Sequence, residues 1–181
     1  LLYEDDKVLV HTIPLQHHVY TNGFLFQEKE GERRLNMDAI TQYPEIEVCD
    51  YQNIKNGKDI ILENGKTIAN TELTFEPHRP QSYAYCSDTV YLEDLATEIR
   101  GTRVIYHEST FLKINEELAA KTMHATAYQA GLVAKNAQAE ALILGHYSSR
   151  YPDVNMFKQE AQEVFKNVFL AEDGKKFVFE N

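Results

Sequence analysis

The chain has 181 residues, of which 43% are hydrophobic, and its formal net charge at pH 7 is −10. This length supplies one core of ordinary size, and no apolar run approaches the roughly 20 residues of a membrane-spanning helix, which excludes a membrane span within these residues. The acidic balance excludes a protein that coats nucleic acid with most of its surface, so any contact with RNA must be local.

The two cysteines, Cys49 and Cys86, are 37 positions apart and form no C-x-x-C pair. That spacing gives neither a disulfide framework nor a thiolate zinc site, and it fits a reducing cytoplasm. The sequence begins with Leu1 rather than Met, and its first ten residues already have the composition of a strand, so we expect the natural N-terminus further upstream.

Residues 1 to about 86 are rich in β-branched and aromatic residues, which is typical of mainly antiparallel strands. Turns are predicted at Thr21-Asn22-Gly23, Glu30-Gly31-Glu32, Asn56-Gly57 and Asn64-Gly65. Two short helices are expected near Leu35 to Gln42 and Tyr51 to Lys55. No Gly/Ser/Pro linker interrupts the chain, so residues 1–181 are treated as one domain.

From Gln81 the pattern predicts strands and helices in alternation. The expected strands are Ser82 to Cys86, Arg103 to Tyr106 and Ala141 to Gly145, with a last hairpin of 168–170 and 176–179. The expected helices are Val90 to Ile99, Glu116 to Lys121 capped by Asn115, Ala127 to Ala139 capped by Thr126, and Met156 to Asn167 capped by Asn155. This predicts an α/β half-sandwich with helices on one face of the sheet.

Polar residues follow each of the three short apolar strands of the second half. Ligands bind at the carboxyl ends of strands in such sheets, because loops and helix N-termini converge there. The residues in question are Ser87-Asp88-Thr89, His107-Glu108-Ser109-Thr110 and His146-Tyr147-Ser148-Ser149-Arg150, with His124 before a helix.

Each of these residues also has an ordinary structural interpretation. A lone Asp88 is usually a helix cap, and a lone His146 is more often a structural histidine. Their joint occurrence favours a dinuclear metal site with a phosphate-binding rim, because imidazole and carboxylate suit zinc and arginine suits a planar phosphate. A histidine held by a carboxylate, as His124 is expected to be by Glu108, is a suitable proton donor to a leaving oxygen.

Four segments resemble successive motifs of ribonuclease Z, a zinc-dependent endonuclease that trims tRNA 3′ ends. They are Tyr85-Cys86-Ser87-Asp88-Thr89, His107-Glu108-Ser109-Thr110-Phe111, His124-Ala125-Thr126 and Leu144-Gly145-His146-Tyr147-Ser148-Ser149-Arg150-Tyr151. Upstream, Pro14-Leu15-Gln16-His17 is similar to the strand that delivers another metal ligand, with His17 rather than His18 aligned. His17 and Asp88 are 71 positions apart and Asp88 and His146 are 58 apart, spacings natural for the family. The resemblance covers essentially the whole chain.

The resemblance implies half of a metallo-β-lactamase αββα sandwich, with a mixed sheet and helices on one face. It implies that His17 ligates one zinc ion, His146 the other, and that Asp88 bridges them, so that the intact enzyme carries two zinc ions. His124, oriented by Glu108, is expected to protonate the leaving oxygen. Ser148 and Arg150 are expected to hold the phosphate, although that turn equally suits a strand-end cap paired with surface carboxylates. The implied partners are a tRNA precursor and a second copy in a homodimer, and no role is carried over to His11, His18, His78 or His107.

Two departures from the family pattern matter. The H-x-H-x-D-H motif, which supplies most remaining zinc ligands, is absent from the 181 residues, so the chain is expected to be the C-terminal half, binding zinc weakly and lacking meaningful nuclease activity alone. The region of about 33–58, where the family places a basic Gly- and Pro-rich arm, has an acidic middle and no Gly-Pro pair. Only Arg33, Arg34, Lys55 and Lys58 flank it.

Two alternatives remain open. The first is a phosphodiesterase of the same fold acting on small phosphodiesters or another RNA, which a small chromogenic diester would separate from a tRNA-processing enzyme. The second is a non-catalytic interaction module, because a half-sandwich exposes an apolar sheet face. The oligomeric state of the chain would separate the interaction module from an enzyme.

Overall fold

The computed structural model describes residues 1–179, which divide into two compact units. The sheet unit consists of Leu1–Glu28 together with the chain from Gln81 on, and the insert unit is Lys29–Pro80. The insert unit contains the 33–58 region discussed above and extends beyond it at both ends. Pro77 and Pro80 lie at the second boundary, whereas the first has only Gly31 beside it.

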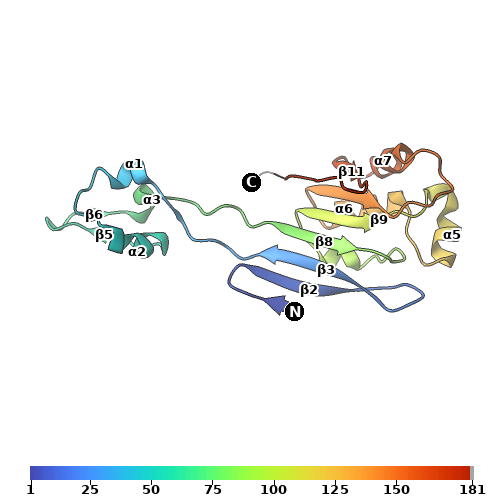
Figure 1. Cartoon of the computed structure of the whole chain (residues 1–181), viewed down its shortest axis with the longest axis horizontal. Coiled ribbons are helices and arrows are strands. Elements are labelled where there is room, and N and C mark those ends of the chain that lie inside the picture. The colour runs from blue at the N-terminus through green and yellow to red at the C-terminus, as the bar shows by residue number, and fades with distance from the viewer. Residues whose placement is uncertain (180–181) are drawn as a thin grey trace. The chain divides into compact units, whose positions relative to one another are not determined.

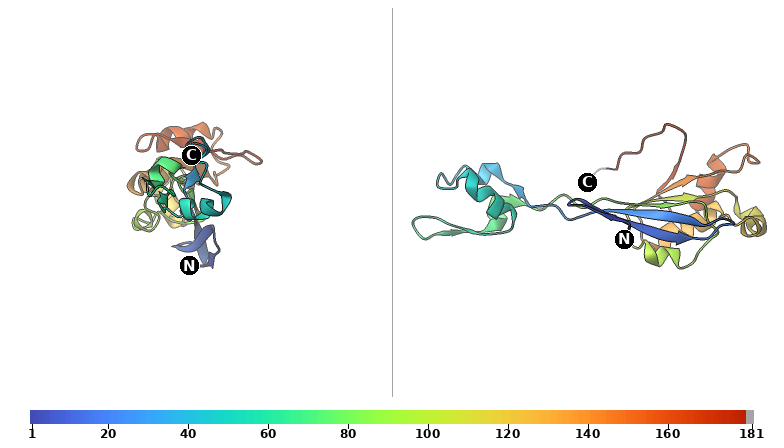
Figure 2. Two further views of the ribbon diagram at one scale, coloured as in Figure 1. Left: turned by 90° about the vertical axis from the view of Figure 1, so that its left-hand side faces the viewer. Right: turned by 60° about the horizontal axis from the view of Figure 1, so that its bottom comes forward.

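The sheet unit is built on a seven-stranded sheet (Figure 1). In spatial order its strands are β1 (Tyr3–Glu4), β2 (Val8–Leu15), β3 (Thr21–Glu28), β8 (Ser82–Cys86), β9 (Val104–Glu108), β10 (Ala141–Gly145) and β11 (Val168–Leu170). The first four are antiparallel neighbours, and β8 to β11 run parallel to one another. The expectation of a mixed sheet is therefore confirmed. Figure 2 shows the blue hairpin of β2 and β3 lying along the other strands.

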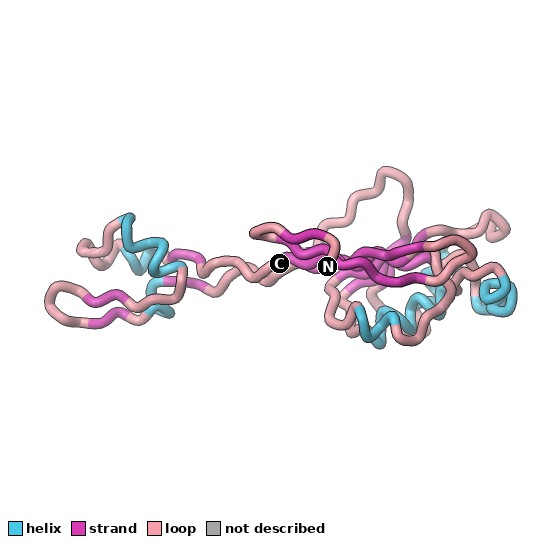
Figure 3. The backbone as a smooth tube through the Cα atoms, turned by 90° about the horizontal axis from the view of Figure 1, so that it is seen from below, coloured by secondary structure: helices cyan, strands magenta, loops and turns pink. Residues whose placement is uncertain are grey.

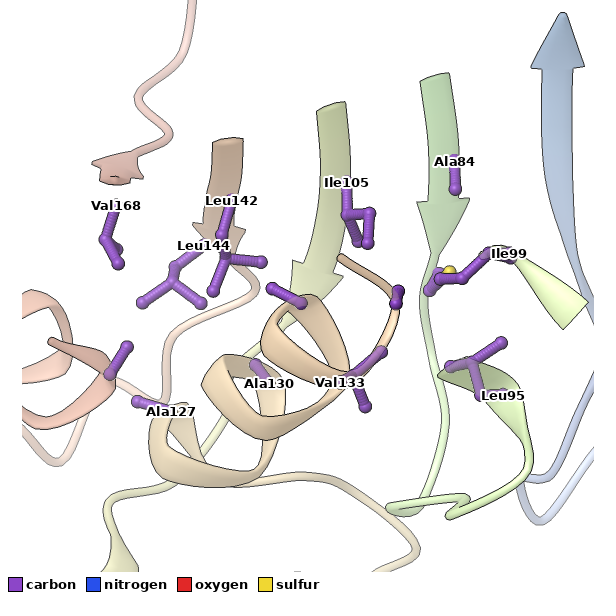
Figure 4. Packing of buried hydrophobic residues seen from close by; sticks show 14 of the residues in the cluster. Ala84, Leu95, Ile99, Ile105, Ala127, Ala130, Val133, Leu142, Leu144 and Val168 are labelled. Atoms are coloured by element: carbon purple, nitrogen blue, oxygen red, sulfur yellow. The ribbon is translucent and has the colours of Figure 1, made fainter. Parts of the chain in front are cut away.

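One face of this sheet packs against helices. The helices are α4 (Leu95–Glu98), α6 (Ala127–Asn136) and α7 (Asn155–Ala161), and α6 is preceded by a 3-10 turn, η2 (Lys113–Asn115), and by α5 (Glu116–Lys121). Figure 4 shows Ile105, Leu142 and Leu144 from the strands meeting Ala130 and Val133 of α6. Burying each large aliphatic side chain in this core stabilises the fold by about 1.5–3 kcal/mol. The expectation of helices on one face is confirmed.

The other face of the sheet is aromatic. Strand alternation brings Phe26, Tyr83, Tyr106 and Phe169 to it, because their neighbours in sequence point towards the helices. The segment after β11 lies on this side (Figure 3), and its Phe177 and Phe179 rings meet Phe169 edge-on. Phe26 is still 39% exposed. A groove of about 570 Å³ with mainly apolar walls remains open on this face.

The insert unit has its own small core. It contains α1 (Met37–Ile40), a 3-10 turn η1 (Val48–Asp50), α2 (Tyr51–Lys55), α3 (Asn70–Leu73), and the strand pairs β4 (Arg34–Leu35) with β7 (Thr74–Phe75) and β5 (Ile60–Ile61) with β6 (Thr67–Ile68). The buried residues are Ile40, Ile46, Ile54, Leu62, Ile68 and Leu73. The side chain of Asn70 donates to the Ile54 and Lys58 carbonyls at 2.6 and 3.1 Å, which fixes α3 against α2.

Several local expectations are confirmed. Helices form over 37–40 and 51–55, within or at the predicted ranges, and the Asn64-Gly65 turn joins β5 to β6, with Gly65 at φ +82°. Thr126 caps α6, because its hydroxyl accepts from the Gln129 backbone and the Gln129 side chain accepts from the Thr126 backbone.

Other local expectations are wrong, and tertiary contacts explain them. Thr21-Asn22-Gly23 is not a turn but the start of β3, where glycine is needed because the Tyr85 carbonyl approaches too closely for a Cβ. The helix expected over 90–99 is only α4, since the Val90 backbone is held by the Gln16 carbonyl at 2.9 Å.

The last helix and the last hairpin also differ from expectation. Helix α7 ends at Ala161 rather than 167, and its first residue Asn155 lies inside the helix instead of capping it. The chain turns there so that Phe165 can pack against the main core. Residues 176–179 form no strand, because Phe177 and Phe179 pack by side chain against Phe169. Within residues 1–179, no helix has the length and apolar character needed to cross a membrane.

Candidate active site

The polar clusters meet at one edge of the sheet, where β8, β9 and β10 end. These strands are parallel neighbours, so Asp88, Glu108 and His146, which follow or end them, are brought to the same edge. The loop between β2 and β3 reaches this edge too. Its Gln16 backbone donates to Thr89 Oγ1 at 3.2 Å, and Thr21 Oγ1 donates to the Asp88 carbonyl at 3.2 Å.

Three imidazole rings lie side by side at this edge. The ring centroids of His17 and His124 are 4.8 Å apart, and those of His124 and His146 are 5.2 Å apart. His146 Nε2 lies 3.4 Å from Asp88 Oδ1, whose carboxylate also accepts from Ser87 Oγ at 2.6 Å. Residues separated by up to 129 positions in sequence thus form one polar cluster.

The carboxylate of Glu108 is fully buried and accepts hydrogen bonds from four groups. His124 Nδ1 lies 2.9 Å from Oε1 and 3.1 Å from Oε2. The other donors are the backbone N–H of Thr89 at 2.7 Å, the backbone N–H of Ala125 at 3.1 Å and the hydroxyl of Thr110 at 2.6 Å. A carboxylate has about four acceptor sites, so Glu108 is saturated by these partners.

The same hydrogen bonds set the tautomer of each histidine. His17 Nδ1 faces the Met123 carbonyl at 2.9 Å and His124 Nδ1 faces Glu108, and both of these oxygens can only accept. His146 Nδ1 lies 2.7 Å from Thr110 Oγ1, whose single proton is given to Glu108. All three histidines therefore donate from Nδ1, which leaves Nε2 of each ring for another partner.

Two of the loops that hold these histidines have left-handed backbone conformations. His146 has φ +60° and Met123 has φ +56°, conformations that cost energy for residues other than glycine. Both strained residues belong to the cluster. The Met123 carbonyl faces His17, and His146 is one of the three histidines. Such strain at a cluster of polar groups is a feature of functional sites.

The cluster fits a metal ion. An unprotonated imidazole nitrogen whose ring is fixed by an N–H donated to an oxygen is the usual arrangement of a zinc ligand, and a carboxylate faces it at Asp88. Glu108, His124 and His146 also offer ligand atoms that lie within 4.8 Å of one another. Glu108 is nevertheless an unsuitable ligand, because its oxygens are already saturated and buried. The free ligand atoms of this edge that suit a metal therefore belong to His17, Asp88, His124 and His146.

A cationic side chain lies beside the cluster. The Arg150 guanidinium stands over the ring of Phe111 at 5.1 Å, and that ring is 6.3 Å from the ring of His124. Arg150 Nε donates to Ser148 Oγ at 3.2 Å, and the Ser148 backbone is held by the Thr110 carbonyl at 3.1 Å. Arg150 is exposed, so its charge is available to an anion near His124.

A pair of stacked tyrosines stands on the aromatic face of the sheet, on the strands that end at the cluster. The rings of Tyr85 and Tyr106 are 4.9 Å apart with an interplanar angle of 14°. Burial, followed by the nearby Tyr85, Asp88 and Glu108, raises the pKa of Tyr106 to about 12, so its phenol stays neutral. Tyr106 lies against Gly145, where a Cβ would collide with the ring. Glycine at this position is thus required by packing next to His146.

Proteins with sequences similar to this chain are named ribonuclease Z. No family model matches the chain. Ribonuclease Z of Phocaeicola vulgatus is 40% identical over 181 residues, which is all of this chain and 58% of that protein. Ribonuclease Z of Bacteroides fragilis is 39% identical over 174 residues (96% and 57%), and that of Cytophaga hutchinsonii is 43% identical over 169 residues (93% and 53%).

Over nearly its whole length the chain is similar to proteins named ribonuclease Z. It spans little more than half the length of the relatives that it matches, and it corresponds to their C-terminal half. This confirms the resemblance drawn from the motifs around Asp88, Glu108, His124 and His146.

Solved structures place the fold. The metallo-β-lactamase-fold protein YhfI from Bacillus subtilis has a TM-score of 0.62 at 15% identity, over 98% of this chain and 52% of that chain. The short form of human tRNase Z has a TM-score of 0.56 at 19% identity, over 96% and 44%. The expected fold class, α/β with the mixed sheet of a metallo-β-lactamase fold, is confirmed.

The residues selected from the sequence motifs lie together in the structure. The motifs did not reveal all of the side chains that contact them. The seven residues selected from the sequence all lie at or beside the cluster: His17, Asp88, Glu108, His124, His146, Ser148 and Arg150. His18 packs against His17 with ring centroids 5.4 Å apart, whereas His11 lies within β2 and His78 is exposed in the insert unit.

Three residues with clear structural roles carry no assignment from sequence. They are Thr89 and Thr110, which donate to Glu108, and Phe111, which lies under Arg150. Their only signal is adjacency to Asp88 and Glu108 within the motifs. His107 is also buried, with Nδ1 donating to the Glu108 carbonyl at 2.7 Å, and its Nε2 has no hydrogen-bond partner among the described residues.

Proposed function

We propose that the intact protein is a zinc-dependent endoribonuclease that hydrolyses a phosphodiester at the 3′ end of tRNA precursors. The observation that carries the proposal is the convergence of His17, Asp88, His124 and His146 at one sheet edge in a chain whose relatives are named ribonuclease Z. The chain is the part of that enzyme which supplies three metal ligands, the proton donor and the phosphate-binding rim.

In this proposal His17 and His146 hold metal through Nε2, because Nδ1 of each ring is occupied by a hydrogen bond. Asp88, whose Oδ1 lies 3.4 Å from His146 Nε2, would be the ligand that the two zinc ions share. Zinc supplies Lewis acidity, which lowers the pKa of bound water and polarises a phosphoryl oxygen. The remaining ligands belong to the part of the enzyme beyond these residues, so the chain alone is proposed to bind zinc weakly and to lack nuclease activity.

The proton for the leaving oxygen comes from His124. Its Nε2 is the ring nitrogen that faces away from Glu108, and Glu108 stabilises the imidazolium by accepting from Nδ1 at 2.9 Å. Since Glu108 is buried and saturated, it holds the ring in one orientation and keeps its negative charge next to it. His124 can thus take up a proton and deliver it from Nε2 when the bond to phosphorus breaks.

Ser148 and Arg150 are proposed to hold the phosphate during this step. The guanidinium is positioned by Phe111 on one side and by Ser148 on the other, so fewer rotamers compete with the binding geometry. Arginine offers a planar pair of N–H donors, which suits a phosphate better than the single ammonium of lysine.

The experiment is cleavage of a labelled tRNA precursor by the full-length protein loaded with zinc, compared with its His124→Ala variant. We expect the wild type to release the 3′ trailer, and the variant to be slower by about 10²- to 10⁴-fold, the usual contribution of a general acid. His78→Ala, an exposed histidine of the insert unit, is the matched control and should retain full activity. Wild-type protein that fails to cut any tRNA precursor refutes the proposal.

A second function, hydrolysis of small phosphodiesters or another RNA, is favoured by the charge of the insert unit. Residues 29–80 contain seven Lys and Arg against ten Asp and Glu, a net charge of −3. An acidic unit is unsuited to gripping a polyanion, because phosphate contacts depend on Lys and Arg. If a small chromogenic diester is cleaved efficiently while a tRNA precursor is not, this second function is correct.

We further propose that the intact enzyme is a cytoplasmic homodimer. Both cysteines are free, Cys86 being buried and Cys49 exposed, which suits a reducing compartment. The homodimer is what the resemblance to ribonuclease Z implies, whereas the aromatic sheet face supports the interaction-module alternative. Sedimentation of the full-length protein tests the dimer. Binding of zinc by the same protein would argue against the non-catalytic interaction module.

A further inference from the structure

The hydroxyl of Thr110 connects Glu108, which holds the proposed proton donor His124, with the proposed metal ligand His146. It is 2.6 Å from Glu108 Oε2 and 2.7 Å from His146 Nδ1. Thr110 is buried, so water does not compete for these contacts. Glu108 also holds His124 at 2.9 Å. A continuous hydrogen-bonded chain therefore runs from His124 through Glu108 and Thr110 to His146.

The direction of each hydrogen bond in this chain follows from the donors available. A threonine hydroxyl has one proton and two lone pairs, and an ionised carboxylate can only accept. Thr110 therefore donates to Glu108 and must accept from His146 Nδ1–H. The hydroxyl fixes which nitrogen of His146 carries the proton, and it leaves Nε2 directed at the side of Asp88, 3.4 Å away.

His146 needs such a support more than the other histidines. Its side chain is 43% exposed, whereas that of His124 is 16% exposed, so packing restrains it less. It follows β10 directly in a left-handed conformation. Without an acceptor at Nδ1, the ring is free to flip about its Cβ–Cγ bond and to take either tautomer.

We propose that Thr110 is a positioning residue that ties the metal-binding geometry of His146 to Glu108. One buried carboxylate then orients both the proton donor and a metal ligand, the first directly and the second through the Thr110 hydroxyl. This inference rests on the proposed function of the site as a zinc centre. It predicts that removal of the hydroxyl weakens metal binding while leaving the His124–Glu108 pair in place.

The test compares Thr110→Val, Thr110→Ser and Thr74→Val in the full-length protein. Valine is nearly isosteric with threonine but lacks the hydroxyl, and serine keeps it. Thr74 is the matched control, because its buried hydroxyl also bridges two partners, accepting from Arg33 at 2.7 Å and donating to the Asn70 carbonyl at 2.8 Å, but it lies in the insert unit. Zinc affinity is measured by competition with a chromogenic chelator, and thermal unfolding of the zinc-free proteins monitors folding.

We expect Thr110→Val to lose about 10- to 100-fold in zinc affinity, the usual effect of removing a partner of a metal-bound histidine. At saturating zinc its kcat should stay within about 3-fold of wild type, because His124 retains Glu108. Thr110→Ser should restore the affinity, and Thr74→Val should not change it.

Wild-type affinity in a folded Thr110→Val protein overturns the inference, as does an equal loss in Thr74→Val or a failure of Thr110→Ser to restore binding. If Thr110→Val does not fold, Thr110→Ser tests the inference instead. The ¹⁵N chemical shifts of His146 in Thr110→Ser then report which ring nitrogen carries the proton. A proton on Nδ1 is expected only if the hydroxyl acts as acceptor. Failure of the proposed function would give a different result. In that case the zinc affinity would still depend on the Thr110 hydroxyl, but the wild-type protein would cut no RNA.

Discussion

His124 Nδ1 lies 2.9 Å from Oε1 of Glu108, and the Glu108 side chain that receives this hydrogen bond is completely inaccessible to solvent. A buried carboxylate is costly unless it is paired and fully hydrogen-bonded, and Glu108 satisfies both conditions. The pair therefore serves two purposes, because it joins the ends of β8 and β9 to the loop before α6 and it orients the proposed proton donor.

Glu108→Gln should destabilise the protein as well as reduce activity. The amide places an NH₂ group where two donors already point, so at least one buried N–H or O–H loses its acceptor, at a cost of about 1–3 kcal/mol. Chemical denaturation of the wild type and the variant measures this. A variant that unfolds at the wild-type denaturant concentration would mean that Glu108 is not the anchor described above. Glu117→Gln, on the surface helix α5, is the control for loss of a carboxylate.

His124→Ala should affect substrates according to their leaving group. A proton donor matters when the leaving oxygen is strongly basic, as in a ribose alkoxide, and matters little for a nitrophenolate. We expect a loss in kcat of about 10²- to 10⁴-fold on RNA and a loss of less than about 10-fold on bis(p-nitrophenyl) phosphate. Equal losses on both substrates would contradict the role of proton donor and indicate a role in holding metal.

Arg150→Ala and Phe111→Leu should both weaken substrate binding. The first removes the cation, and the second removes the ring that positions it, which contributes about 0.5–1 kcal/mol at an exposed site. KM should rise in both variants and depend less on salt concentration in Arg150→Ala, since one phosphate contact is gone. Arg100→Ala, an exposed arginine paired with Gln138 in the same unit, is the control. An unchanged KM in Arg150→Ala rules out the phosphate role.

Stability should fall in mild acid because of His107. Burial lowers the pKa of this histidine, although the adjacent Glu108 opposes the effect. A folded-state pKa below the unfolded value of about 6.5 means that the unfolded chain binds the proton first. The stability contribution is therefore present above about pH 6.5 and is lost as pH falls towards the folded-state pKa, by up to about 1.4 kcal/mol per pH unit.

The variant His107→Asn tests this, because the asparagine amide can still donate to the Glu108 carbonyl but does not titrate. The free energy of unfolding of wild type should decline more steeply than that of the variant between about pH 7 and about pH 5. Parallel pH profiles would show that His107 is not the group responsible.

The sequence was most informative where function and local chemistry coincide. Three short apolar strands followed by Asp88, Glu108 and His146 predict both a parallel arrangement and a shared sheet edge, because both features follow from strand period and chain direction. The Thr126 cap and the Asn64-Gly65 turn were also predictable, since each depends on a few adjacent residues.

The sequence was least informative where distant contacts override local preference. Thr21-Asn22-Gly23 has the composition of a turn, yet Gly23 is in a strand because the Tyr85 carbonyl lies against it. The pairing of Glu108 with His124 was expected, but its other partners come from positions 89, 110 and 125, and no periodic pattern links them. The resemblance located only the 33–58 part of the insert unit, and its full extent was not predictable, because its core forms between residues up to 33 positions apart, from Ile40 to Leu73.

Whether this sheet edge is a metal centre is decided by the zinc content of the full-length protein and of its Asp88→Ala variant, measured by elemental analysis after removal of free metal. We expect two zinc ions per wild-type chain and a marked loss in Asp88→Ala, because Asp88 is the proposed shared ligand. Equal zinc content in both proteins, or none in wild type, would contradict the assignment of this edge of the sheet as a metal centre.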